Sequence, residues 1–559
     1  MTGKRSLRTR VAGVFLFLPL LAQVRFDRFV RDAAYPGSRM VPAVSALLSL
    51  LSLKLLDKER RSHINDFNFD EALGLFAGLN ILPKKSFATA YSYRTQRTYQ
   101  EQLLAAWIAQ LAPLLFPEPE AFNLDFHAIP YRGDPAGLDK HFLPMRGKAG
   151  TSVLTFFAQE QKSRVLCYAN ANLSRDDQAG EVLRFVDFWH NITGRDPQWL
   201  YFDSKLTNYA ELSRLNERGI SFITIRRRGA AITRRLERLP KTAWHKAHLD
   251  IPKRLHKNIR YVAETVRLRD YDGSLRQIAV DGLGRERMTL FLCNNTDATP
   301  RDIVLRYARR NGIEDGLGVS VNFFHLDCLA SAVRLNVDLD VALTVIANGC
   351  YRWLAHQLHG LDKAKPKDLY RKVVETAGRI DVAPEQIVVH FDRRAHNPLL
   401  REAALDRALA KLATHRRLDQ ARRRRQRSTA AQARRRSQLS RFWPTSTRLY
   451  LGGQKPKKVF CRSKSYRGGL KNSTVGPRCS GAGQGQRVPL HRRARARARR
   501  VPGLPRRRLH DGPTAVDADD RRGRRHDDLG LPPRRQGAAD GDRPAEAVTS
   551  AKGVRTFGG

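Results

Sequence analysis

The segment Tyr307-Ala-Arg-Arg-Asn-Gly-Ile-Glu314 places an aromatic ring, a guanidinium and a carboxylate at regular spacing, on Tyr307, Arg310 and Glu314. Positions i, i+3 and i+7 share one face of a continuous helix. A planar, permanently charged arginine suits a phosphate, and a carboxylate suits a hard divalent cation such as magnesium. The pattern predicts a helix over 299–311, with Glu314 at its C-terminal end, that could act on a phosphodiester.

Two further acids stand in short apolar runs that are typical of buried strands. Asp125 lies in Phe-Asn-Leu-Asp-Phe-His-Ala-Ile, and Asp203 follows Trp-Leu-Tyr-Phe. An acid in such a setting usually has a specific role. Together with Glu314, these acids could gather at one end of a sheet. Three carboxylates there could hold two magnesium ions about 3.5–4 Å apart, an arrangement that cleaves phosphodiesters.

Each assignment has a structural alternative. Asp125 could cap the following turn, and Asp203 could cap a helix N-terminus. Glu314 could be an ordinary exposed acid, and Arg310 a partner in a surface salt bridge of small energy. Tyr307 could pack in the core or contact DNA, and the sequence does not separate the two.

Composition favours a folded protein with a polyanionic partner. The chain has 559 residues, 42% of them hydrophobic, and a formal net charge of +47. Nucleic acid is the expected partner for so basic a protein. The sequence contains no Gly-x4-Gly-Lys-Ser/Thr loop, so no nucleotide cofactor is expected. The six cysteines form no Cys-x-x-Cys pair, which fits a reducing cytoplasm and predicts neither a zinc site nor a disulfide framework.

Periodicity divides the chain into five regions. Residues 1–117 read as an all-helical N-terminal domain, with possible DNA binding, and 118–228 as strands followed by alternating helix and strand. Residues 229–287 read as a basic, β-rich insertion, and 288–415 as the rest of the α/β core with covering helices at about 323–335 and 340–359. The apolar stretches 11–24 and 41–56 are expected to be core helices, with no membrane span.

The tail, 416–559, differs from the rest. It carries about +29 of the net charge and is rich in glycine, proline and arginine without apolar periodicity. Two interpretations stay open: a disordered basic tail, or a GC-rich gene read in the wrong frame. Sequencing the 3′ end of the gene separates them, because a frame error would leave a helix-patterned continuation in another frame.

The three acids in this order, with Tyr307 and Arg310 at their spacing from Glu314, resemble a bacterial insertion-sequence transposase of the DDE type. More narrowly, the chain resembles the group with a Tyr-x2-Arg-x3-Glu-x6-Lys signature. The signature lysine falls at Val321, where the match fails.

This resemblance implies a ribonuclease-H-like core interrupted by the insertion, with Asp125, Asp203 and Glu314 as catalytic metal ligands. It implies two Mg²⁺ ions, for which Mn²⁺ could substitute, and a homodimer that binds terminal inverted repeats and target double-stranded DNA near the bacterial nucleoid. The alternatives are an inactive or host-adopted DNA-binding protein of the same fold, and a metal nuclease without strand transfer. Expected DNA contacts come from Tyr307, Arg310, Arg226, Arg227, Arg228, Arg234 and Arg235.

Overall fold

The structure is a computed structural model. It describes residues 5–116, 121–133, 138–143, 147–171, 173–174, 176–251, 255–284, 287–328, 334–383, 386–403, 405 and 446–451. The chain divides into two compact units, Met1–Ser465 and Tyr466–Gly559, and every described residue lies in the first.

Helices fill residues 12–115, whereas Arg5–Thr9 form a strand, so the prediction that 1–117 is all-helical was wrong for this segment. The helices are η1 (Ala12–Phe17), α1 (Leu18–Gln23), α2 (Phe26–Asp32), α3 (Ala43–Leu55), η2 (Arg61–Phe67), α4 (Glu71–Phe76), α5 (Lys85–Ala90), η3 (Tyr91–Arg94) and α6 (Arg97–Leu115). Both apolar stretches are buried helical segments, as predicted. Helix α3 is mainly apolar and is buried nearly all round; the buried hydroxyls of Ser49 and Ser52 donate to carbonyls of the preceding turn. Within the described part of the chain, no helix is long and apolar enough to cross a membrane.

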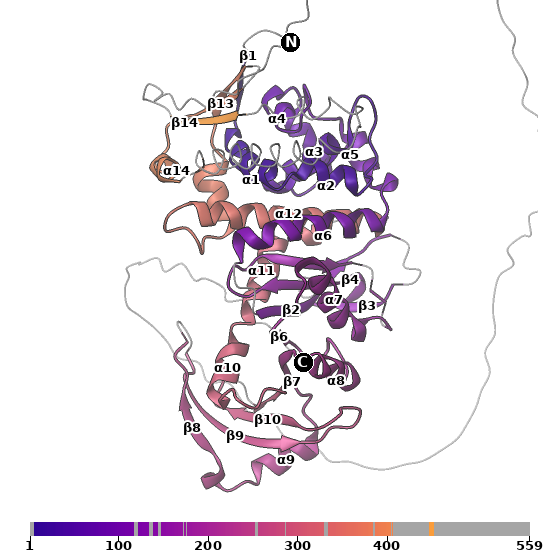
Figure 1. The fold of residues 1–559 in the computed structure, drawn as a ribbon, viewed down its shortest axis with the longest axis vertical. Coiled ribbons are helices and arrows are strands. Elements are labelled where there is room, and N and C mark those ends of the chain that lie inside the picture. Colours follow the sequence, from indigo (N-terminus) through magenta and orange to yellow (C-terminus); the bar gives the residue numbers. More distant parts are fainter. Residues whose placement is uncertain are drawn as a thin grey trace, which may run out of the picture. The chain divides into compact units, whose positions relative to one another are not determined.

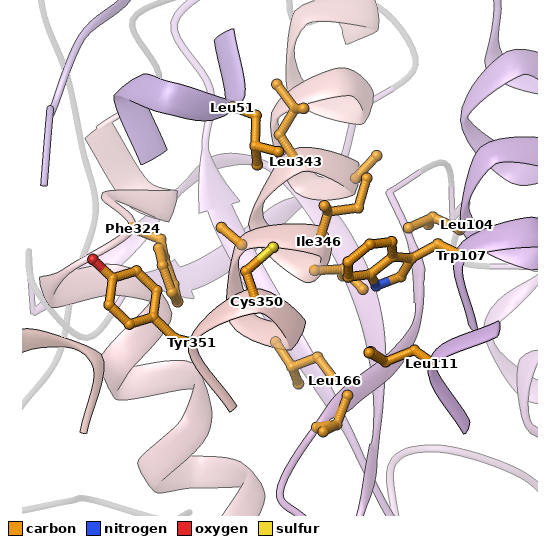
Figure 2. Packing of buried hydrophobic residues seen from close by; sticks show 14 of the residues in the cluster. Leu51, Leu104, Trp107, Leu111, Leu166, Phe324, Leu343, Ile346, Cys350 and Tyr351 are labelled. Atoms are coloured by element: carbon orange, nitrogen blue, oxygen red, sulfur yellow. The ribbon is translucent and has the colours of Figure 1, made fainter. Parts of the chain in front are cut away.

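Helix α12 (Arg334–Gln357) packs against α6 and β5, between the N-terminal helices and the sheet (Figure 1). Ile346 and Cys350 of α12 meet Trp107 of α6 and Leu166 of β5 in a continuous apolar core (Figure 2). One buried ion pair crosses this core. The Lys54 ammonium on α3 lies 2.5 Å from the Asp340 carboxylate and donates to the Phe324 carbonyl.

Ten strands form the large mixed sheet. They are β2 (Ala121–Pro130), β3 (Lys140–Leu143), β4 (Lys148–Glu160), β5 (Leu166–Asn170), β6 (Trp199–Phe202), β7 (Ser221–Ile225), β8 (His245–His248), β9 (Asn258–Val266), β10 (Leu275–Asp281) and β11 (Thr289–Cys293). Their order is β3-β4-β2-β6-β7-β11-β10-β9-β8, with β5 also beside β4. Strands β2, β6 and β7 are parallel, and the other pairs are antiparallel.

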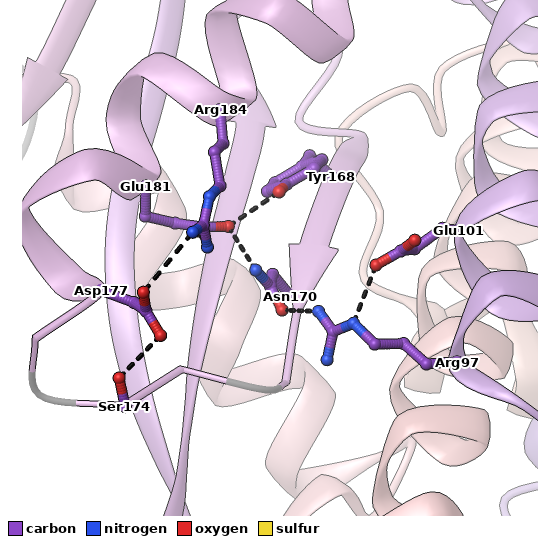
Figure 3. A network of polar contacts seen from close by, with 8 residues as sticks. All are labelled: Arg97, Glu101, Tyr168, Asn170, Ser174, Asp177, Glu181 and Arg184. Carbon is purple, nitrogen blue, oxygen red and sulfur yellow. Dashed lines mark hydrogen bonds and ion pairs between the residues drawn. The ribbon is translucent and has the colours of Figure 1, made fainter.

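Two helices make the crossover connections of the parallel strands. After η5 (Gln178–Gly180), helix α7 (Glu181–Thr193) joins β5 to β6, and α8 (Tyr209–Glu217) joins β6 to β7. A polar network ties α7 and β5 to α6 (Figure 3). The fully buried Glu181 carboxylate accepts from Tyr168 and Asn170, each at 2.7 Å, and Asn170 in turn accepts from Arg97. Burial raises the pKa of Glu181, and these donors act against that rise.

The basic region 229–287 contains α9 (Ala230–Glu237), η6 (Lys241–Ala243) and strands β8–β10. Its strands continue the large sheet, because β10 pairs with β11 and β11 pairs with β7. Leu236 of α9 packs on Ala279 and Leu290, so the helix covers one face of these strands.

The helix predicted over 299–311 ends early. Helix α10 covers Pro300–Ala308, and Glu314 lies in the first turn of a separate helix, α11 (Asn311–Asn322). At the junction, the backbone N–H groups of Gly312 and Ile313 bond to carbonyls three residues back, and Asn123 approaches the Arg309 carbonyl. Asn311 and Gly312 are weak helix formers, which favours the break. The prediction of one continuous helix face was therefore wrong.

The covering helix predicted over 323–335 was also wrong in its described part. Residues 326–328 form only a 3-10 turn, η7 (Leu326–Cys328), and α12 begins at Arg334. Residues 329–333 lie outside the described residues.

A second, four-stranded sheet lies apart from the large one. Strand β1 (Arg5–Thr9) pairs antiparallel with β12 (Gly378–Ala383), β12 pairs antiparallel with β13 (Gln386–Phe391), and β14 (Ser446–Leu451) pairs parallel with β13. The elements α13 (Pro366–Leu369), η8 (Tyr370–Val374) and α14 (Asn397–Glu402) accompany it. Strand β14 belongs to the region 416–559 and comes just before Gly452, where the glycine-, proline- and arginine-rich segment expected to be disordered begins. Residues 416–445 and 452–559 lie outside the described residues.

Candidate active site

The two predicted aspartates occupy matching positions on neighbouring parallel strands. In the register of β2 and β6, Asn123 pairs with Tyr201, and each aspartate comes two residues later. Asp125 lies within β2, and Asp203 follows the last residue of β6. The carboxyl ends of parallel strands meet at one edge of a sheet, which is where α/β proteins commonly bind ligands.

Arg310 joins two of the three acids. Its guanidinium lies 3.0 Å from the Asp125 carboxylate and 2.8 Å from that of Glu314. The Arg310 side chain is only 8% exposed, whereas the Glu314 side chain is 52% exposed. The structure therefore brings Asp125, Arg310 and Glu314 together, although they come from segments almost 190 residues apart in the sequence.

The charges of this cluster act on one another. Burial raises the pKa of Asp125 to about 6; Arg310 opposes that rise, and Glu314 and Asp203 add to it. Burial disfavours the charged form of Arg310, but the carboxylates outweigh burial and hold the pKa of its guanidinium above the ordinary value. All three acids thus lie close enough to influence the same arginine.

Tyr307 is held by packing. Its ring meets Phe291 edge-on at 5.2 Å between centroids, and its hydroxyl lies 3.5 Å from the Phe202 carbonyl. The Arg310 guanidinium lies 5.9 Å from the centre of the Tyr307 ring. Burial raises the pKa of Tyr307, which keeps the hydroxyl protonated. Tyr307 therefore packs in the core, which is one of the two roles that the sequence left open, and its contact with DNA stays a prediction.

Buried amides and glycines place helix α11, and these residues were absent from the sequence-based site. A side-chain carbon at Gly312 would lie 3.3 Å from the Gln159 oxygen, and one at Gly316 would lie 2.5 Å from its nitrogen. Gln159 is fully buried on β4 and meets Asn123 at 3.5 Å. The available signal was two glycines four residues apart on one helix face, together with polar Asn123 inside an apolar strand.

His127 lies on the same face of β2 as Asn123 and Asp125, because alternate strand residues share a face. Its Nε2 lies 2.6 Å from the Asp327 carboxylate in η7. This pair fixes η7 against β2 beside the acids. Position 321, where the signature lysine is absent, is filled by Val321, which packs partly buried against the main core.

The donor chemistry of the acid cluster fits magnesium, because carboxylate oxygens are its preferred protein ligands. Burial is the main cause of the raised pKa of Asp125, and the nearby Glu314 and Asp203 add to it, so a cation bound here would favour the ionised carboxylate. Among the described residues, however, no three His, Cys, Asp or Glu side chains form a ready-made metal-binding group. The positions of Asp125 and Glu314 are instead set by their shared contact with Arg310.

The arginines predicted to contact DNA differ in whether their side chains are already paired within the protein. Arg226 bonds to Gln277, and Arg235 forms a two-point ion pair with Glu264 at 2.6 and 2.8 Å. Three others are exposed and, among the described residues, have no carboxylate partner: Arg227, Arg228 and Arg234. These three retain charge for a phosphate, whereas the charge of Arg235 is already neutralised.

The acids, Arg310 and Tyr307 thus lie around the middle of β2 and the carboxyl end of the neighbouring β6, and α9 packs on the extension of the same sheet. No protein-family model matches this sequence, and no curated protein matches it.

Proposed function

We propose that this chain is a DNA transposase that binds terminal inverted repeats and catalyses metal-dependent cleavage and strand transfer. The observation that carries the proposal is the contact of Asp125 and Glu314 with one arginine, Arg310, beside Asp203 at the end of the neighbouring strand. The three acids belong to β2, to the end of β6 and to α11, and their charges act on one another.

The order of the strands supports a ribonuclease-H-like core. Strands β5, β4 and β2 are adjacent and antiparallel, and β6 and β7 follow β2 in parallel, with α7 and α8 as their connections. Helix α11 then brings the third acid to the sheet after the basic region has extended it. This is the arrangement that the resemblance to DDE transposases implies.

Asp125, Asp203 and Glu314 would hold the ions, two Mg²⁺ or Mn²⁺ in a site of this class. When bound, such ions activate a water and stabilise the leaving oxygen at a phosphodiester. Arg310, buried and fixed by two carboxylates, would present its remaining N–H groups to the phosphate that is cut. Its Nε has no partner among the described residues. Arg227, Arg228 and Arg234 would follow the DNA backbone.

The test uses the purified full chain, labelled duplex DNA carrying the flanking inverted repeats, and Mg²⁺ or Mn²⁺. Asp203→Asn should lower end cleavage by more than about 100-fold, because even partners of metal ligands are worth 10- to 100-fold. DNA affinity should be retained. The matched control is Asp362→Asn, which alters an exposed surface acid and should cleave normally. Equal cleavage by both variants would sink the assignment of Asp203.

One observation favours a second candidate, an inactive DNA-binding protein of the same fold. Arg310 bridges Asp125 and Glu314, and it could replace the ions permanently as their charge partner. DNA binding without cleavage under every metal condition would favour this candidate. Cut ends that are never joined to target DNA would instead indicate a metal nuclease without strand transfer.

A further inference from the structure

Arg352, near the C-terminal end of α12, is a buried arginine that forms no ion pair with any residue that the structure describes. The residue is only 6% exposed, and its Nε has no hydrogen-bond partner among the described residues. No described carboxylate lies within ion-pair distance of its guanidinium. A buried charge without a partner is costly, so it is usually retained for a function.

The nearest charged groups do not remove this excess of positive charge. Arg164, in the turn between β4 and β5, adds to burial in lowering the pKa of Arg352 to about 10. Asp315 on α11 opposes that change, but its carboxylate is already paired with Lys365 at 2.6 Å. Among the described residues, Asp315 is thus the one acid that acts on Arg352, and it is shared with Lys365, while Arg164 adds positive charge.

The turn itself is held in a defined shape. The fully buried Glu160 carboxylate accepts from the backbone N–H groups of Lys162 and Ser163, at 3.0 and 2.6 Å. Arg164 adopts a left-handed backbone with φ of 59°, which is uncommon for a residue other than glycine. The Glu160 oxygens are thus engaged within the turn, and Arg164 is fixed beside α12.

This cationic group is connected to the acid cluster by Gln159. The Gln159 amide donates to the Arg164 carbonyl at 3.4 Å and packs against Gly316 of α11, the helix that carries Glu314. The two groups of charges therefore lie on one rigid unit. A ligand that spans both must carry more than one negative charge, as a nucleic-acid backbone does.

We propose that Arg352 and Arg164, with Lys365 beside them, form a subsite for a backbone phosphate of the DNA substrate. The proposal rests on the proposed function. A guanidinium pair offers the fork of N–H donors that phosphate oxygens accept, and a bound phosphate would balance the buried charge.

The test compares the full-length wild type with Arg352→Met in magnesium-free buffer, using a fluorescent duplex that carries the inverted repeat. Loss of one phosphate contact should lower the slope of log K against log salt by about 0.9 and weaken binding at low salt. Arg352→Met should also unfold at the same or a higher temperature, because it removes an unbalanced buried charge. Arg352→Lys should keep most of the slope.

The matched control is Arg214→Met on α8, an exposed arginine whose charge is neutralised by Glu211 at 3.1 Å. It should leave the slope unchanged. An unchanged slope in folded Arg352→Met would overturn the proposal, and so would a lower unfolding temperature, which would show that Arg352 supports the fold. Stabilisation of the wild type by inorganic phosphate, with no change in the DNA slope of the variant, would also overturn it in favour of a small-anion site.

The same measurements separate this proposal from the proposed function. A reduced slope in a protein that never cleaves DNA would support the subsite and contradict the transposase. Normal cleavage with an unchanged slope would support the transposase and contradict the subsite.

Discussion

The raised pKa of Asp125 makes a prediction about stability that needs no DNA. Its folded-state pKa is about 6, against an ordinary value of 3.8. Each pKa unit corresponds to about 1.4 kcal/mol, so ionised Asp125 lowers the free energy of unfolding by about 3 kcal/mol at neutral pH. Because the folded state holds the proton more tightly, this loss is complete above about pH 7 and vanishes below the ordinary pKa of 3.8.

Asp125→Asn removes the titrating group, so the stability of the variant should not show this pH-dependent loss. The free energy of unfolding of the wild type, minus that of the variant, should fall by about 2.4 kcal/mol between pH 4 and pH 7. Urea unfolding of both proteins at intervals over that range measures the difference, and titrating groups outside the acid cluster cancel. Asp362→Asn, at an exposed acid, should give a flat difference.

Parallel wild-type and Asp125→Asn curves would refute the burial argument. So would a difference of opposite sign, which would mean that Arg310 stabilises the Asp125 anion more than burial disfavours it. Added Mg²⁺ supplies a second readout at pH 7. If the acid cluster binds the ion, the wild type should gain stability and Asp125→Asn should gain much less.

Two further predictions concern the scaffold. Gly316→Ala should destabilise the protein by roughly 1–3 kcal/mol, because its new carbon would meet the buried Gln159 amide at 2.5 Å. Gly318→Ala on the same helix has open space and should stabilise by up to about 1 kcal/mol; urea unfolding of both variants checks the contrast. Lys54→Met should cost roughly 3–5 kcal/mol by leaving Asp340 buried and unpaired, and adding Asp340→Leu should recover most of that loss, as thermal unfolding would show.

Local sequence pattern predicted the strands around the site well. The runs that contain Asp125 and precede Asp203 are strands β2 and β6, and the core helices over 11–24 and 41–56 are present. Apolar runs and alternation report burial, and burial within a strand or helix depends mainly on near neighbours in sequence.

Features that depend on contacts between distant segments could not be predicted from the sequence. The helix break before Glu314 involves a contact between Asn123 and the Arg309 carbonyl. The pairing of Arg310 with Asp125 likewise joins segments whose proximity only the assembled sheet provides. The packing of Gly312 and Gly316 on Gln159 is of the same kind, because a glycine in a sequence does not reveal what lies against it.

The continuous hydrogen bonding from β6 through β7, β11 and β10 to β9 has a mechanical consequence. A linked domain could swing, but a strand ladder is stiff, so α9 cannot move far from Asp203 without breaking backbone hydrogen bonds. Helix α9 packs on β10 and β11, and the three strand spacings from β6 to β10 amount to about 14 Å, close to the length of four base pairs. In the proposed transposase, the sheet would therefore fix the distance along the duplex between the bond that is cut and the phosphates that the arginines of α9 contact.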